Sequence, residues 1–210
     1  MGKIACLRSC CDTFSRSSPS TTMSGSISIL LEPNTLPERI IVEDIRLKLG
    51  EQIERTEHLV RLVPPNALAW KPQLQTTSTN LNHLLGHLLD CLAGVCAVFH
   101  AAFPHELAHL AQLQSLPVNH ACQPEEALQR IREYTKHIEQ AFALCNDNDL
   151  RRMIPSVFVP QGETLLTLLL GNLEHLINHK YQLFFYLKLY GLPVTSKDIY
   201  HWRGAPGDQG

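Results

Sequence analysis

The chain has 210 residues, with 18 Lys and Arg against 20 Asp and Glu, so its formal net charge at pH 7 is −2. This length suits one domain with a sizeable core, and the near-balanced charge excludes the strongly basic surface of many nucleic-acid-binding domains. Residues 1–28 lack the apolar run of a secretory signal, and no stretch reaches the roughly 20 charge-free apolar residues of a membrane span. Residues 165–189 come closest. We therefore predict a cytoplasmic protein that binds neither nucleic acid nor a membrane.

Residues 1–36 are rich in Ser and Thr and lack the periodicity of a core-forming segment, so they are predicted to be a disordered leader. Residues 37–203 form the predicted domain, and residues 204–210 a flexible tail. Three of the seven cysteines fall in the leader. Because the total is odd and paired zinc-ligand spacing is missing, the cysteines are predicted to be free thiols in a reducing compartment.

Four long helices are predicted from apolar residues that recur at helical spacing. They span about residues 38–62, 78–103, 124–145 and 162–190. Ser78 is the predicted N-cap of the second helix, Pro124 suits the first turn of the third, and Gly191 suits a left-handed C-cap after the fourth. No strand pattern competes with these helices. The predicted fold class is therefore all-α, in the form of a four-helix bundle.

The predicted fourth helix carries two histidines in an apolar environment. His175 and His179 are one helical turn apart and share one face, with Gln182 and Tyr186 further along the same stripe. Burying two imidazoles without partners costs a few kcal/mol, and a divalent metal is a partner that both rings can share. The alternative is a pair of hydrogen-bonded core histidines, because this spacing arises easily by chance in a chain with 11 histidines.

A catalytic zinc site usually has three protein ligands and an open position, so a neighbouring helix is expected to supply the third ligand. The predicted second helix offers His83 and His87. At about 100 degrees per residue, His87 lies at the edge of the apolar face, whereas His83 lies further toward the polar side. Spacing favours His87 but does not fix the third ligand by itself.

Two segments resemble the motifs of the DinB/YfiT-like family of four-helix-bundle metalloenzymes. Residues 78–90, STNLNHLLGHLLD, resemble its second-helix signature, in which one His stands in an apolar run of the type LLxHL. Residues 175–191, HLINHKYQLFFYLKLYG, are similar to its fourth-helix pattern, H-x3-H-R-G-Q-L followed by YLR and Gly. The resemblance covers about residues 38–203. It departs from the family at Lys180 and Tyr181, where Arg-Gly is frequent, and this departure concerns helix packing rather than the ligands.

The resemblance implies a metal centre formed by His87, His175 and His179. Zn²⁺ and Ni²⁺ are the favoured metals, although imidazole also suits Fe²⁺ and Mn²⁺. The family includes thiol S-transferases that use low-molecular-weight thiols and proteins described as metal-dependent hydrolases. The chain is therefore expected to act on a small molecule by metal-activated thiolate or water, with a low-molecular-weight thiol as a cofactor in the transferase version.

Several alternatives stay open from the sequence. The chain is either a metal-dependent enzyme or a non-catalytic metal-binding or stress-linked protein, and no general base is identifiable. Asp90 is either a site residue or a solvated helix residue, and Cys91 is either near the metal or a small core residue. Gln182 and Asn172 either orient an imidazole or satisfy a core polar group. A homodimer is also expected, through a helix face that the sequence does not locate.

Overall fold

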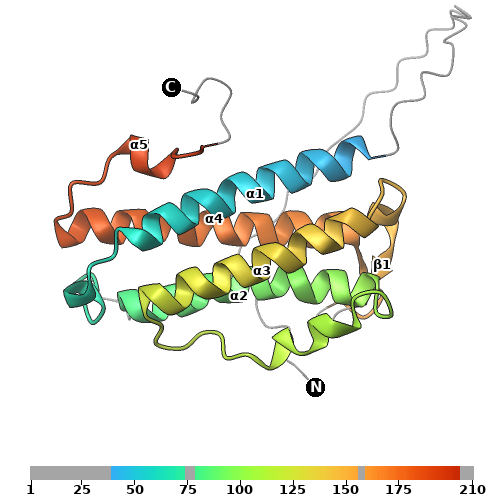
Figure 1. Ribbon diagram of the computed structural model, residues 1–210, viewed down its shortest axis with the longest axis horizontal. Coiled ribbons are helices and arrows are strands. Elements are labelled where there is room, and N and C mark those ends of the chain that lie inside the picture. Colours follow the sequence, from blue (N-terminus) through green and yellow to red (C-terminus); the bar gives the residue numbers. More distant parts are fainter. Residues whose placement is uncertain (1–38, 74–78, 156–158, 204–210) are drawn as a thin grey trace, which may run out of the picture.

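The computed structural model describes residues 39–73, 79–155 and 159–203, so the predicted leader (1–36) and tail (204–210) lie outside the described residues. Four long helices run lengthwise (Figure 1), namely α1 (Ile40–Arg61), α2 (Leu81–Ala102), α3 (Pro124–Leu144) and α4 (Leu165–Tyr190). The shorter elements are the 3-10 helices η1 (Pro65–Ala67), η2 (Ala108–Ala111), η3 (Leu113–Ser115) and η4 (Asp149–Arg151), the helix α5 (Ser196–Ile199), and the strands β1 (Met153–Ile154) and β2 (Glu163–Thr164). The predicted predominantly helical class is confirmed.

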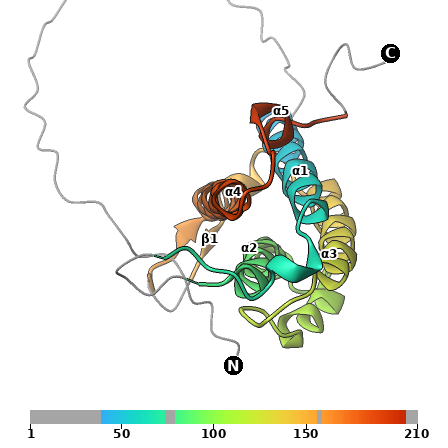
Figure 2. The same cartoon turned by 90° about the vertical axis from the view of Figure 1, so that its left-hand side faces the viewer.

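Each long helix has two principal neighbours among the other three. α2 packs on α4 and α3, and α1 packs on α3 and α4. In a view turned by 90°, the helices follow one another around a shared core in the order α1, α3, α2, α4 (Figure 2). Leu and other apolar side chains from all four helices fill this core. Because α2 and α4 are direct neighbours, polar residues on their facing sides are brought together.

α2 is the most apolar of the long helices. Among the described residues it is the helix that is long and apolar enough to cross a membrane by length and composition. The sequence analysis found no stretch that reaches this limit and named residues 165–189 as the one that comes closest. In the structure, 61% of that apolar window is buried. A helix enclosed by protein neighbours needs the same apolar composition as a membrane span, so packing against α3 and α4 accounts for it.

The ends of α2 and α4 can be compared with the helix caps predicted from the sequence. Asn80 caps α2, because its side-chain oxygen accepts a hydrogen bond from the backbone N–H of His83 at 3.3 Å. The predicted cap, Ser78, lies outside the described residues, and the helix begins after Asn80. Gly191 ends α4 with φ of 102°, the left-handed conformation that favours glycine, as predicted.

The start of α4 was predicted three residues too early. Thr164 is the N-cap, and its side chain accepts a hydrogen bond from the backbone N–H of Thr167 at 3.1 Å. Thr164 and the residue before it pair with Met153 and Ile154 in a short antiparallel hairpin. The sequence analysis found no strand pattern and did not predict this hairpin. Strands of two residues are too short to give an alternating pattern in the sequence.

Lys180 makes a buried polar link between α4 and α1. Its side chain is almost fully buried, and its Nζ donates a hydrogen bond to Gln52 Oε1 at 2.6 Å. Burial lowers the pKa of Lys180 to about 8, because the charged form loses its hydration. The place where the sequence departs from the family pattern is thus a place where two helices are joined by a polar contact.

Candidate metal centre

Three histidines predicted as ligands converge between α2 and α4. His87 comes from α2, whereas His175 and His179 come from α4, and one ligand atom of each lies within 4.8 Å of the other two. The Nε2 atom of His87 lies 2.9 Å from Nε2 of His179 and 3.3 Å from Nε2 of His175. All three residues are half-buried. Three ring nitrogens that converge in this way can surround one cation.

The structure separates the two histidines of α2. His83 is exposed, and its Nδ1 lies 2.8 Å from the side-chain oxygen of Asn80 at the start of the helix. It is not part of the convergent group. Of the two alternatives considered from the sequence, His87 is the one that meets the histidines of α4.

Gln182 sets the tautomer of His179. Its Oε1 lies 2.8 Å from His179 Nδ1, and its Nε2 donates a hydrogen bond to the hydroxyl of Tyr186 at 3.2 Å. An amide oxygen can only accept, so His179 Nδ1 carries the proton and donates it. The Nε2 of His179 therefore presents a lone pair toward the other histidines. This contact corresponds to the orienting role considered for Gln182 from the sequence.

Asn119 sets the tautomer of His87 in the same way. Its Oδ1 accepts a hydrogen bond from His87 Nδ1, and its Nδ2 donates to Asp90 Oδ2 at 3.1 Å. A carboxylate oxygen can only accept from the amide, so the amide oxygen of Asn119 faces the imidazole. The lone pair of His87 then lies on Nε2. Asp90 is thereby engaged in orienting Asn119.

Asn119 is the site residue that sequence reasoning missed. It precedes α3, and its φ of 57° lies in the left-handed region that Asn adopts more readily than most residues. Its backbone N–H donates to Gly86 O at 3.1 Å, and a Cβ on Gly86 would lie only 2.1 Å from His120 O. Gly86 therefore allows this segment to lie against α2 next to His87. A glycine inside an apolar helix, directly before a histidine, was the available signal.

The electrostatics of the three histidines favour a cation over a proton between them. Two Nε2 lone pairs at 2.9 Å repel each other unless a positive centre lies between them. Burial lowers the pKa of His179 to about 4, chiefly because the imidazolium loses hydration, and it also lowers the pKa of His175. A proton is therefore bound poorly near neutral pH. Neutral imidazoles with directed lone pairs are the ligand form that a divalent metal requires, so this donor set fits one.

Other residues considered near the centre have packing roles. Asn172 donates to Leu168 O at 2.8 Å, and a Cβ on Gly94 would lie 2.2 Å from Asn172 Oδ1, so this pair lets α4 approach α2 closely. Cys91 is buried, its Sγ lies 3.6 Å from His87 O, and it is not part of the convergent group. Trp70 packs edge-on against Tyr186 with ring centroids 5.7 Å apart, which anchors the connector before α2 on α4.

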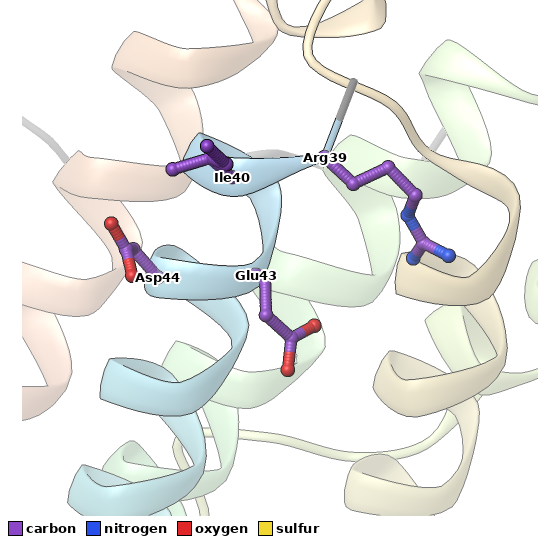
Figure 3. A pocket seen from close by; sticks show the side chains of 4 residues that line it. All are labelled: Arg39, Ile40, Glu43 and Asp44. Atoms are coloured by element: carbon purple, nitrogen blue, oxygen red, sulfur yellow. The ribbon is translucent and has the colours of Figure 1, made fainter. Parts of the chain in front are cut away.

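A separate hollow of about 350 Å³ lies at the start of α1 (Figure 3). Arg39, Ile40, Glu43 and Asp44 line it, and none of the three histidines does. Arg39 donates to a backbone oxygen of α3, and the Glu43 carboxylate is paired with an arginine on its own helix. Two charged groups of this hollow, those of Arg39 and Glu43, are thus engaged in helix packing and in an ion pair.

No family model matches the chain, and comparison with curated proteins finds no match either. Among solved structures, the chain is similar to the crystal structure of a candidate member of the DinB family from Exiguobacterium sibiricum. The two share 17% identity over 73% of this chain and 94% of the other, with a TM-score of 0.44. The family named there is the one whose motifs residues 78–90 and 175–191 resemble.

Proposed function

We propose that His87, His175 and His179 bind one divalent metal ion, on a DinB-like four-helix bundle formed by α1 to α4. The observation that carries the proposal is the 2.9 Å approach of two Nε2 atoms, on His87 and His179, that both present lone pairs. The hydrogen bonds from Asn119 and Gln182 support it, because metal-ligating histidines commonly have their other ring nitrogen held in this way.

We infer that the metal is Zn²⁺ or Ni²⁺ and that it supplies Lewis acidity to a small thiol or to water when bound. The convergent group contains three protein ligands within the described part of the chain, which leaves a position for an exogenous group. The protein contributes three converging imidazoles, two of which are oriented by side-chain amides. Asn119 and Gln182 hold the Nδ1 protons of His87 and His179 away from the centre, so the Nε2 atoms of these two residues stay available.

We further propose that the reaction is small-molecule thiol S-transfer, with metal-dependent hydrolysis as the second candidate. The support is the resemblance of residues 78–90 and 175–191 to motifs of the DinB/YfiT-like family, which includes thiol S-transferases. One observation favours a non-catalytic metal-binding or stress-linked protein instead. Two titratable side chains near the centre, Asp90 and Tyr186, are both engaged with the amides that orient the histidines. Cytoplasmic location, a small-molecule partner and a homodimer stay predictions.

Metal content by plasma mass spectrometry tests the metal centre. The variants His87→Ala, His175→Ala and His179→Ala are each expected to bind one equivalent fewer than the wild type after loading with Zn²⁺. His83→Ala is the matched control, because this histidine is exposed on α2 and outside the convergent group. Wild-type metal content in His175→Ala would refute the ligand assignment.

A cobalt-loaded protein distinguishes the enzyme from the non-catalytic alternative. Addition of 2-mercaptoethanol is expected to change the visible spectrum of Co²⁺ if a small thiol enters an open position. The part of this change that belongs to the three-histidine centre should be missing in His175→Ala. A spectrum that does not respond to thiol in the wild type would favour a closed, non-catalytic site.

A further inference from the structure

A second cluster of ligand-type side chains lies where the segment before α3 meets the first turn of that helix. A ring nitrogen of His120, the sulfur of Cys122 and a carboxylate oxygen of Glu126 all lie within 4.8 Å of one another. His120 Nε2 lies 2.8 Å from Glu126 Oε1. Cys122 is fully buried, whereas the side chains of His120 and Glu126 are 26% and 40% exposed. The cluster is therefore closed on the sulfur side and reachable from solvent on the other.

The backbone holds this cluster in place. The N–H of Cys122 donates to Asn82 O at 3.0 Å, which fixes the residue against α2. α3 begins at Pro124, so Glu126 lies in its first turn and close to Cys122. The three side chains thus need little rearrangement to share an ion.

The hydrogen bonding of the cluster is incomplete within the described part of the chain. The buried Nδ1 of His120 has no hydrogen-bond partner there. A divalent ion between the three side chains pairs with the carboxylate, and a coordinated thiol loses its proton.

Arg130 is a neighbouring cation, and its placement is compatible with a bound ion. Its Nη1 lies 3.9 Å from Glu126 Oε1. The guanidinium also donates to Pro117 O and to the hydroxyl of Tyr134, which hold it on the α3 side. A thiolate and a carboxylate together balance the charge of a divalent ion. The ion, the thiolate and the carboxylate together are neutral, so the arginine gives this region one net positive charge.

We propose that His120, Cys122 and Glu126 form a second metal site, with Zn²⁺ as the expected ion. One nitrogen, one sulfur and one oxygen ligand suit the borderline softness of Zn²⁺ and leave a fourth position for water. The ligand set differs from the three-histidine centre because it contains a thiolate. Asn119 directly precedes His120, so an ion here would also fix the segment that holds Asn119 against His87.

Cobalt titration of the full chain tests the site, with Cys6, Cys10 and Cys11 replaced by Ser so that these thiols do not compete. We expect a thiolate-to-cobalt charge-transfer absorption in the near ultraviolet. Cys122→Ala should abolish this absorption and remove one equivalent of Co²⁺. Cys91→Ala should retain both, which controls for the other thiol located beside a candidate ligand.

The outcomes separate this site from the three-histidine centre. His175→Ala should keep the charge-transfer absorption, because it removes a ligand of the other centre only. The proposal would be overturned if the protein that retains Cys122 shows no charge-transfer absorption, or if the absorption persists in Cys122→Ala. If Cys122→Ala does not fold, Glu126→Gln replaces it, since this side chain is partly exposed. The Co²⁺ affinity of Glu126→Gln, measured from the same charge-transfer absorption, should be lower than that of the protein with Glu126 by about 10-fold or more. An unchanged affinity would refute the site.

Discussion

The Nε2 atoms of His87 and His179 lie 2.9 Å apart, although each imidazole carries its proton on the opposite ring nitrogen. Two lone pairs at this distance do not form a hydrogen bond. The amides of Asn119 and Gln182 impose the arrangement, because their oxygens can only accept. The preference of this pair for a shared cation is therefore set by residues that do not themselves face the centre.

The two orienting amides are expected to control metal affinity. Asn119→Ala and Gln182→Ala should each weaken binding at the three-histidine centre by about 10- to 100-fold, because the imidazoles lose their fixed tautomer and orientation. Competition with a chromophoric chelator measures this, in a Cys122→Ala background that removes the second cluster. Asn178→Ala is the control, since this residue is exposed on α4. Equal affinity of all the variants would contradict the orienting role.

Gly86→Ala is expected to lower the free energy of unfolding by about 1–3 kcal/mol, because the new Cβ overlaps a backbone oxygen. That Cβ would lie 2.1 Å from His120 O. The segment that carries Asn119 must then move from α2, so metal affinity should fall as well. Urea denaturation measures the first effect. Gly50→Ala is the matched control, because a Cβ there meets nothing within 4 Å and a helical alanine is expected to add about 0.5–1 kcal/mol. Wild-type stability or better in Gly86→Ala would exclude this close approach.

The metal-free protein is expected to lose stability as the pH falls from about 6.5 to about 4. The pKa of His179 is about 4 in the folded protein against an ordinary 6.5, so in this interval the unfolded chain takes up a proton that the folded chain does not. The contribution is fully present above the unfolded pKa and is lost as the pH falls. Urea denaturation in chelator at a series of pH values measures it. His179→Gln should show a shallower slope, and an unchanged slope would assign the pH dependence to other groups.

Metal removal is expected to lower the melting temperature of the Cys122→Ala protein. An ion that binds only the folded state, at a free concentration 100 times its Kd, stabilises that state by about 2.7 kcal/mol. Calorimetry with and without chelator measures the difference. His175→Ala in the same background should melt at one temperature in both conditions. A chelator effect of wild-type size in that variant would show that the ion binds elsewhere.

The helical elements and the His175–His179 pair were predictable because both depend on local spacing. Residues one turn apart share a helix face whatever surrounds the helix. Capping was less predictable at Asn80, because Ser78, Thr79 and Asn80 are all candidate N-caps in the sequence, and at Thr164, where a short hairpin delays the start of α4.

The sequence by itself determined that α4 presents two imidazoles one turn apart on the same face, and that α2 offers His87 at the edge of its apolar face and His83 further toward its polar side. Only the tertiary structure decided that His87 meets them, because this depends on how closely α2 and α4 pack. It also decided that Asn119, from a distant segment, sets the proton on His87. Helical periodicity is a property of residues close together in the sequence. The contact between Asn119 and His87 instead depends on how closely two distant segments pack, which Gly86 permits.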